Sequence, residues 1–360
     1  MKPIKLRLLA VLSVFLAASF SADACTSMLV SAKASGTGRP LMWKNRDTDH
    51  DQNFIEKVPA MGGRMGYVAL FNGGDAKLSE AWMGMNDAGF AVMNTASYNL
   101  APDTAKIKDR EGLLMTAALK NCRSVDDFER LIKAQKRPLG VQANFGVMDA
   151  MGGLAYFEVN DIGYKRYNVD DAPGGYMVRS NYSVAGKKGE GHGYLREASL
   201  KHVLAEELAS GSFRPESFTE KASKSFYNAV IGKDFETDTC SWVIDQDFIA
   251  RYTSSASVVI EGVNPDQPVS DMIMWTLLGY PPCSFVVPVT LNNVPDMLRP
   301  TADGFTSPYC TSVLGIKENV FPIKIDNGKR YINMKALRPI LQKSRQKSLE
   351  IYNKAYELRK

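Results

Sequence analysis

Histidine is scarce in this 360-residue chain, and its scarcity excludes several kinds of enzyme. The three histidines are His50, His192 and His202, and none stands at a metal-ligand spacing from another histidine or a cysteine. A structural zinc site or an HExxH metalloenzyme is therefore not expected. A Ser-His-Asp triad is also disfavoured, because His192 lies in the glycine-rich stretch GEGHGYL, which is typical of a surface loop.

Strong net charge is missing as well. The formal charge is +5, and Lys2, Lys5 and Arg7 contribute three of the positive charges, so the remainder of the chain is near +2 (5 minus 3). A nucleic-acid partner would require clustered Lys and Arg, so none is expected. The basic segment 335–360 interleaves Leu, Ile and Tyr at helical spacing, which indicates a solvated C-terminal helix.

Long apolar runs are missing too, and the one short run near the start has the features of an export signal. Basic residues precede the apolar segment 8–20, and Ala22, Asp23 and Ala24 form an A-x-A cleavage site. No segment offers about 18 consecutive apolar residues, so no transmembrane helix is predicted. We therefore predict that signal peptidase removes residues 1–24, and that the protein is exported to the periplasm or the extracellular space without membrane attachment after processing.

The mature chain would begin at Cys25 and contain 336 residues (360 minus 24). No repeat, low-complexity tract or linker divides it, so we treat residues 25–360 as a single domain with a helical C-terminal tail. The oligomeric state stays open, and a homo-oligomer is compatible with the sequence.

Cysteine is also infrequent. The chain has five cysteines, at Cys25, Cys122, Cys240, Cys283 and Cys310. No CxxC pair is present, and although export permits disulfides, the spacing does not fix any pairing. If four of the cysteines pair, Cys25 is the natural candidate for the remaining thiol.

An N-terminal Cys25 would carry a thiol and a free α-amine on one residue. The ordinary pKa values are about 8.5 for the thiol and about 7.7 to 8.0 for the amine, so the amine can accept the thiol proton without a histidine. Such a nucleophile suits attack on an amide carbon and formation of a thioester. Two other interpretations stay open, a lipid attachment site and a disulfide-bonded or inert thiol. The acidic Asp23 departs from the usual lipidation signal.

Strand-like segments occur in hairpin runs, with the helical segments grouped between them. Strands are predicted at 25–32, 40–47, 66–72, 80–86, 89–98, 143–150, 154–161, 239–246 and 255–263. Helices are predicted at 109–122, 124–135, 193–210, 217–232 and 335–360. Turn-rich residues join 25–32 to 40–47 and 143–150 to 154–161, which indicates two hairpins. This order favours an α+β fold with antiparallel sheets covered by helices.

The segment CTSMLVSAKASGTGRPLMWKNRDTD resembles the start of the linear-amide C–N hydrolases of the N-terminal nucleophile (Ntn) hydrolase superfamily. That group includes choloylglycine hydrolases, penicillin V acylases, acid ceramidase-like enzymes and isopenicillin-N acyltransferase relatives. The resemblance implies that Asp47 holds the α-amine of Cys25. It maps the cation beside the thiol to Lys44, where arginine is commoner, and Arg46 is the alternative. A cation beside the sulfur would favour the thiolate.

Two later segments extend this resemblance to about residues 25–260. WMGMNDAGFAVMNTASYNL is similar to a family segment whose later asparagine helps to form the oxyanion hole, which implies that role for Asn94. GYMVRSNYSVAG is similar to the family's strand followed by Thr-Asn, which points to Asn181. Arg251 is the nearest counterpart of a further family arginine that could contact the substrate.

The resemblance implies a four-layer αββα sandwich of two antiparallel sheets, the Ntn-hydrolase fold. It also implies a single-chain amidohydrolase that uses Cys25 to cleave a small-molecule linear amide, with no cofactor or metal. A Cys-type dipeptidase and an acyltransferase are alternatives in the same superfamily. An alternative of another class is a ligand-binding envelope lipoprotein lipidated at Cys25. The acyl and amine specificity, the choice between hydrolysis and transfer, and the choice between Lys44 and Arg46 stay open.

Overall fold

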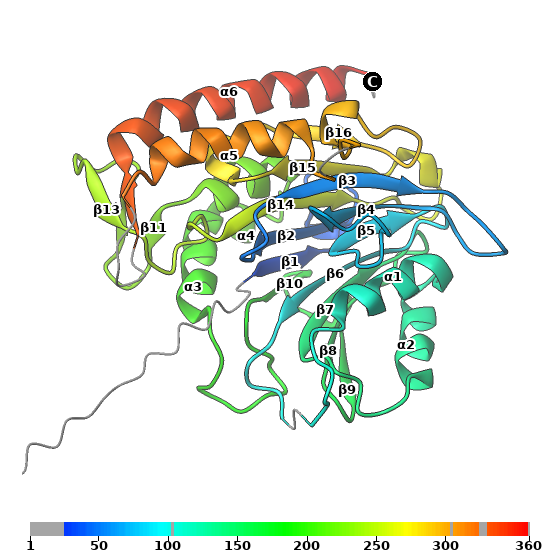
Figure 1. Cartoon of the computed structure of the whole chain (residues 1–360). Helices are drawn as coiled ribbons and strands as arrows, with labels where there is room; N and C mark the ends of the chain where they lie inside the picture. The colour runs from blue at the N-terminus through cyan, green and yellow to red at the C-terminus, as the bar shows by residue number, and fades with distance from the viewer. Residues whose placement is uncertain (1–24, 102–103, 303–304, 324–329, 359–360) are drawn as a thin grey trace, which may run out of the picture.

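The computed structural model describes residues 25–101, 104–302, 305–323 and 330–358, so the predicted signal peptide (1–24) lies outside the described residues. Within these ranges, two large sheets are formed, and all their strand pairs are antiparallel (Figure 1). The six-stranded sheet has the order β10 (Tyr176–Arg179), β1 (Thr26–Val30), β2 (Leu41–Asp47), β14 (Ser254–Glu261), β15 (Ile273–Leu278) and β16 (Val287–Val289). The seven-stranded sheet runs in chain order from β3 (Asn53–Val58) through β4 (Tyr67–Asn72), β5 (Met83–Asn86), β6 (Ala91–Ala96), β7 (Ala143–Met148) and β8 (Leu154–Val159) to β9 (Tyr164–Asn168).

The two sheets pack face to face over the central core. Side chains alternate between the faces of a strand, so every second residue of each sheet points to the other sheet. The shared cluster includes Leu29, Met42, Val258 and Ile260 from the first sheet, and Ile55, Leu70, Met85 and Met93 from the second. The Met-rich strands β5 and β6 therefore contribute mainly to the core.

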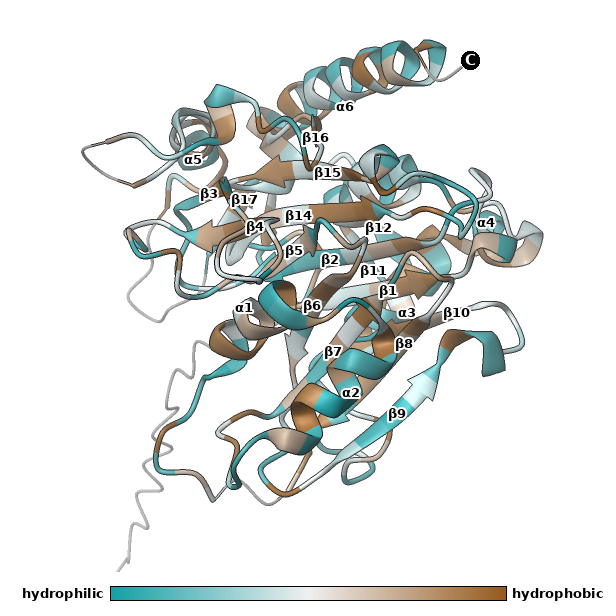
Figure 2. Ribbon diagram, turned by 90° about the vertical axis from the view of Figure 1, so that its right-hand side faces the viewer, coloured by the Kyte–Doolittle hydropathy of each residue, from teal (hydrophilic) through white to brown (hydrophobic). Residues whose placement is uncertain are grey.

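Helices cover the two outer faces. On the seven-stranded sheet, α1 (Glu111–Asn121) and α2 (Val125–Ala134) bury their apolar sides. On the six-stranded sheet, α3 (Tyr194–Val203) and the end of α6 (Met334–Glu357) pack against residues such as Trp43 and Trp275. In Figure 2, α2 and α6 carry hydrophilic and hydrophobic residues along their length, as expected for helices with one packed face. The expected αββα sandwich is confirmed.

The remaining elements lie around this frame. They are α4 (Ala205–Ser210), α5 (Pro308–Val320), a hairpin of β11 (Tyr227–Asn228) and β12 (Lys233–Asp234), and a pair formed by β13 (Trp242–Ile244) and β17 (Tyr331–Asn333). No helix among the described residues combines the length and the apolar character needed to cross a membrane.

Local signals explain the elements that were predicted well. Ser124 caps α2, because its hydroxyl accepts from the Asp127 amide at 3.1 Å while the Asp127 carboxylate accepts from the Ser124 amide at 3.0 Å. Both predicted hairpins are confirmed, β1 with β2 and β7 with β8.

One predicted helix, 217–232, is largely wrong. Residues Ser217–Lys221 form a π-helical turn and Ala222–Lys224 a 3₁₀ turn, after which the chain enters the β11–β12 hairpin. Asn228 begins the hairpin turn, since its side chain accepts from the amide of Val230 at 3.0 Å. Such local side-chain bonds favour turns over helices.

Strand pairing sets the position of the candidate site. Cys25 immediately precedes β1, and β2 runs antiparallel to β1 with Thr26 opposite Asn45. The C-terminal half of β2 therefore lies beside the start of β1. Strand β6 of the other sheet packs against both β1 and β2 at the same place.

Candidate active site

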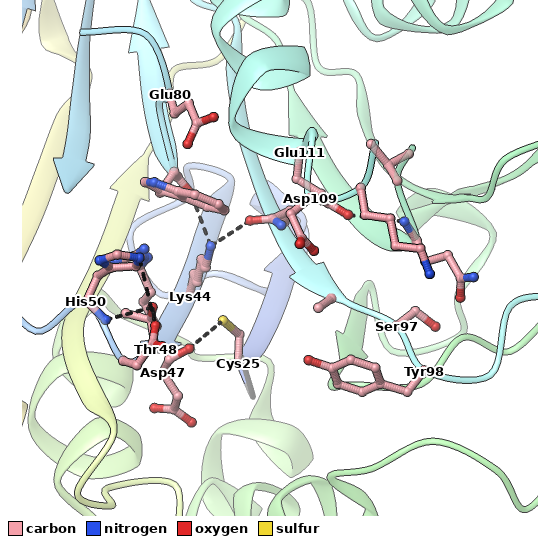
Figure 3. Close-up of a pocket in the computed structure, with 18 of the residues that line it drawn as sticks. Cys25, Lys44, Asp47, Thr48, His50, Glu80, Ser97, Tyr98, Asp109 and Glu111 are labelled. Atoms are coloured by element: carbon pink, nitrogen blue, oxygen red, sulfur yellow. Dashed lines mark hydrogen bonds and ion pairs between the residues drawn. The ribbon is translucent and has the colours of Figure 1, made fainter. Parts of the chain in front are cut away.

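A cavity of about 720 Å³ opens beside the start of β1, and Cys25 is part of its lining (Figure 3). Four of the other predicted site residues line the same cavity: Lys44, Arg46, Asp47 and Asn94. The fold therefore brings together residues that are up to 69 positions apart (94 minus 25).

Cys25 is held through its main chain and points its sulfur into this region. The residue is 4% exposed. Its thiol contacts the main-chain carbonyl of Asp47 at 3.8 Å, and its own carbonyl oxygen accepts from Arg196 Nη1 at 2.6 Å. The backbone of the candidate nucleophile is thus fixed by a charge-assisted hydrogen bond.

Lys44 determines the orientation of the Asn94 amide. Its ammonium group donates to Asn94 Oδ1 at 2.7 Å and to the main-chain carbonyl of Trp82 at 3.1 Å. An ammonium group only donates, so the Asn94 atom that it meets must be the oxygen. The N–H₂ group of Asn94 is therefore turned away from Lys44, and no acceptor among the described residues bonds it. Asn94 is 5% exposed and lines the cavity, so this N–H₂ group can donate to a bound molecule.

Arg46, the other cation considered, has different contacts. Its guanidinium donates to Asn53 Oδ1 at 2.6 Å and to Asn72 Oδ1 at 2.7 Å, on β3 and β4 of the opposite sheet. It also lies 4.9 Å from the centre of the Trp82 ring, a cation–π contact. Arg46 therefore ties the two sheets together at the cavity wall, whereas Lys44 is bonded to Asn94.

Asp47 is buried in a dense set of donors. Its Oδ1 accepts from Ser254 at 2.6 Å and from Asn45 at 2.9 Å. Its Oδ2 accepts from Nε and Nη2 of Arg251 at 2.9 and 2.8 Å, so the ion pair consists of two charge-assisted hydrogen bonds to one oxygen. Burial raises the pKa of the Asp47 carboxyl, while Arg251, Arg196 and Ser254 oppose that shift. Arg251 therefore contacts the Asp47 carboxylate and is not among the residues that line the cavity.

Arg196 was missed by the sequence analysis, although it bonds directly to the candidate nucleophile. It is fully buried on α3. Besides the Cys25 carbonyl, it donates to Thr26 Oγ1 at 2.8 Å, to Asn181 Oδ1 at 2.7 Å and to Asp247 Oδ1 at 2.8 Å. Asp247 in turn pairs with Arg251, so a chain of alternating charges connects Cys25 to Asp47.

A sequence signal for Arg196 was present. It stands four and eight residues before Leu200 and Leu204, both buried, and so occupies the apolar stripe of the helical segment. A charged residue in such a stripe needs a buried partner.

Asn181 lies behind the cavity wall. Its Oδ1 accepts from Arg196, and its Nδ2 donates to the main-chain carbonyl of Ala96 at 2.9 Å, at the end of β6. Asn181 therefore connects α3 to the strand that carries Asn94. These contacts suit a role for Asn181 in positioning the neighbouring site residues.

No disulfide joins any two of the five cysteines, all of which are described, so the conditional expectation of four paired cysteines is not met. Burial raises the pKa of the thiol to about 12 in Cys122 and Cys283 and to about 11 in Cys310. Cys25 is the cysteine that lines the cavity. Among the described residues, no three His, Cys, Asp or Glu side chains are grouped as a metal site would require.

Comparison with protein families gives one match. The sequence model of the family described as acyl-coenzyme A:6-aminopenicillanic acid acyl-transferase matches residues 41–236. This range contains Lys44, Asp47, Asn94, Asn181 and Arg196, but not Cys25 or Arg251. Among curated protein sequences, no match was found.

Several solved structures are similar at low identity. The Caenorhabditis elegans N-acylethanolamine-hydrolyzing acid amidase ortholog has 15% identity and a TM-score of 0.44, over 73% of this chain and 100% of that chain. A mutant of the conjugated bile acid hydrolase from Clostridium perfringens has 10% identity and a TM-score of 0.43, over 75% and 93%. Penicillin V acylase from Agrobacterium tumefaciens has 12% identity and a TM-score of 0.41, over 75% and 87%. With TM-scores below 0.5, these similarities do not bear on the activity of the chain.

Proposed function

The chain belongs to the acyl-coenzyme A:6-aminopenicillanic acid acyl-transferase family of Ntn hydrolases, and from that premise we propose that it is an amidohydrolase with Cys25 as its N-terminal nucleophile. The substrate would be a linear C–N amide, cleaved by way of a thioester. The observation that carries the proposal is the Cys25 thiol in a cavity that also presents the N–H₂ group of Asn94, oriented by Lys44.

Maturation is the first step of this proposal. Signal peptidase would cut after Ala24 during export, which frees the α-amine of Cys25 and leaves a single chain without internal self-cleavage. The Arg196 bond to the Cys25 carbonyl supports this step, because it holds the residue in place independently of the peptide bond that is cut. Asp47, which forms a buried ion pair with Arg251, also contacts the Cys25 thiol through its main-chain carbonyl, and we propose that its carboxylate holds the new amine.

Acylation would then proceed as follows. The α-amine takes the thiol proton, directly or through a water, and the sulfur attacks the amide carbon. The carbonyl oxygen becomes an oxyanion, to which Asn94 donates from its N–H₂ group together with a main-chain N–H. The C–N bond breaks, the leaving nitrogen takes the proton from the α-ammonium group, and a thioester remains on Cys25. One oxyanion donor contributes roughly 10²–10³ in rate in other acyl-transfer enzymes.

Deacylation decides between hydrolysis and transfer. Water attacks the thioester in hydrolysis and gives a free acid, whereas an amine gives a new amide. The matching family is named after an acyl-transferase. Transfer of the acyl group to an amine is therefore a second candidate function, supported by that match. Both routes share the Cys25 thioester.

The test uses the full chain, exported and purified, with its N-terminus determined by intact mass. The proposal requires a chain that begins with unmodified Cys25. A diacylglyceryl adduct would instead support the lipoprotein alternative. The processed protein is then assayed against conjugated bile acids, penicillin V, N-acyl amino acids and dipeptides, with and without an added acceptor amine.

Two variants complete the test. Cys25→Ser should abolish turnover of whichever amide is cleaved, while Cys240→Ser, a half-buried cysteine outside the cavity lining, serves as the control. Unchanged turnover in Cys25→Ser would overturn the assignment of the nucleophile.

A further inference from the structure

Asp247 joins the two arginines that bind the candidate nucleophile and its neighbouring carboxylate. One oxygen of its carboxylate, Oδ1, accepts from Arg196 Nε at 2.8 Å and also from Arg251 Nη1. Arg196 donates in addition to the main-chain carbonyl of Cys25 at 2.6 Å. Arg251 donates in addition to the Asp47 carboxylate at 2.9 and 2.8 Å. Asp247 therefore links the arginine that fixes the carbonyl of Cys25 to the arginine that fixes Asp47.

The two guanidinium groups are close enough to repel one another in a buried setting. Arg196 is fully buried, and the side chain of Arg251 is 14% exposed. Burial and the positive charge of Arg251 lower the pKa of Arg196, while the negative charges of Asp247 and Asp47 raise it. Two carboxylates thus balance two cations. Without the charge of Asp247 the group would be net positive, and Asp47 alone would oppose the repulsion between the arginines.

The bonds of Asp247 also connect separate elements of the fold. Arg196 lies on α3, whereas Asp247 lies in the segment 245–253, between β13 and β14. The main-chain carbonyl of Ile249 in this segment accepts from Asn45 Nδ2 on β2 at 3.0 Å. The ion pair of Asp247 with Arg196 therefore joins α3, whose arginine binds the start of β1, to a segment that is bonded to β2.

We propose that Asp247 is a positioning residue for Cys25. By binding both arginines, it keeps the Cys25 carbonyl at a fixed distance from the Asp47 carboxylate, so that the α-amine is oriented to take the thiol proton. Asp247 is not among the residues that line the cavity, and it acts through the two arginines rather than on the substrate. This inference rests on the proposed function, because it concerns the orientation of the same nucleophile.

The experiment compares Asp247→Asn with Asp247→Glu in the exported full chain, after intact mass has established that each variant begins at Cys25. Asparagine keeps the shape of the side chain and removes its charge. Asp247→Asn should lower kcat by about tenfold or more on the best amide of the substrate panel, the lower end expected for a hydrogen bond to a charged group, and leave KM nearly unchanged. Glutamate restores the charge, and the 35% exposure of the Asp247 side chain leaves room for one more methylene, so Asp247→Glu should recover most of the loss.

A double-mutant cycle tests whether Asp247 acts through Arg196. The variant that combines Asp247→Asn with Arg196→Lys should be little slower than Arg196→Lys alone, because both changes disturb the same link. Unfolding in urea is measured for every variant, and kcat is calculated per folded molecule. Asp247→Ser removes the same charge with a smaller side chain, and it should show the same loss if Asp247→Asn does not fold.

Asp271 gives the matched control variant. Its partly exposed carboxylate binds Arg39 at 3.3 Å, and neither residue lines the cavity, so Asp271→Asn makes the same chemical change and should leave kcat unchanged. Wild-type kcat in Asp247→Asn, a loss that glutamate does not recover, or losses that multiply in the double variant would overturn the inference and leave the proposed function intact. Turnover that survives in Cys25→Ser would overturn the proposed function itself.

Discussion

Replacing Lys44 by methionine tests how the Asn94 amide is oriented. In the structure, the Lys44 ammonium donates to Asn94 Oδ1 at 2.7 Å, and this bond directs the N–H₂ group of Asn94 to the cavity. Methionine keeps most of the length of the buried side chain but removes the donor. The Asn94 amide would then be free to rotate, and a fraction of molecules would present its oxygen to the oxyanion.

The size of the effect follows from the type of bond. A hydrogen bond to a charged group has a net value of about 1.5–3 kcal/mol, and each 1.4 kcal/mol or so is tenfold in rate. Lys44→Met should therefore reduce kcat/KM by about 10- to 150-fold. Asn94→Ala removes the donor itself and should reduce it by about 10²–10³-fold. The loss should fall mainly on kcat, because the oxyanion forms only in the transition state.

The assay is a double-mutant cycle on the best amide substrate, with unfolding measured for each variant. If Lys44 acts through Asn94, the double variant should be little worse than Asn94→Ala, with a coupling energy of about 1.5–3 kcal/mol. Losses that simply multiply would refute the reasoning, and they would indicate that Lys44 acts on the thiol alone.

Three further predictions concern charged groups outside the cavity lining, namely Arg251, Arg196 and Asp245. Arg251→Met should raise the pKa of Asp47 further and destabilise the protein by about 3–5 kcal/mol, because it leaves a buried carboxylate without its partner. Thermal unfolding checks this, and an unchanged melting temperature would argue against it. Arg196→Lys keeps the charge but cannot reproduce the fork of bonds to Cys25, Thr26 and Asn181, so kcat should fall by about tenfold or more while the N-terminus is still processed at Cys25. Wild-type kcat in that variant would exclude a positioning role. Burial raises the pKa of Asp245 to about 7, so its contribution to stability is present below about pH 4 and is lost as the pH rises through about 7. Asp245→Asn should therefore flatten the decline of the unfolding free energy with pH in urea titrations, and equal slopes would contradict this.

The sequence predicted those features of the fold and the site that depend on residues close together in the chain. The hairpin of 25–47 could be predicted because a turn-rich segment joins two strand-like ones, and it alone brings Cys25 beside Lys44 and Asp47. Asn94 could be named only through the family resemblance. Its bond to Lys44 depends on the packing of β6 against β2, which no local pattern encodes.

One strand was missed for a physical reason, and one helix was missed although its sequence signals were present. Strand β15, with the sequence IMWTLL, is buried along almost its whole length, so it lacks the alternation that marks a half-exposed strand. Helix α5 went unrecognised although Ser307 caps it and Pro308 occupies its first turn. The Asp47–Arg251 pair joins residues 204 positions apart, and its partners are adjacent only because β14 pairs with β2.

The most direct test of the central claim is the mass of the processed protein during turnover of a slow amide substrate. Quenching in acid and intact-mass analysis, followed by peptide mapping, should reveal a chain that begins at Cys25 and carries the acyl group on its sulfur. The adduct should be absent in Cys25→Ser. An active protein that begins at another residue, that is lipidated at Cys25, or that acylates elsewhere would contradict the account.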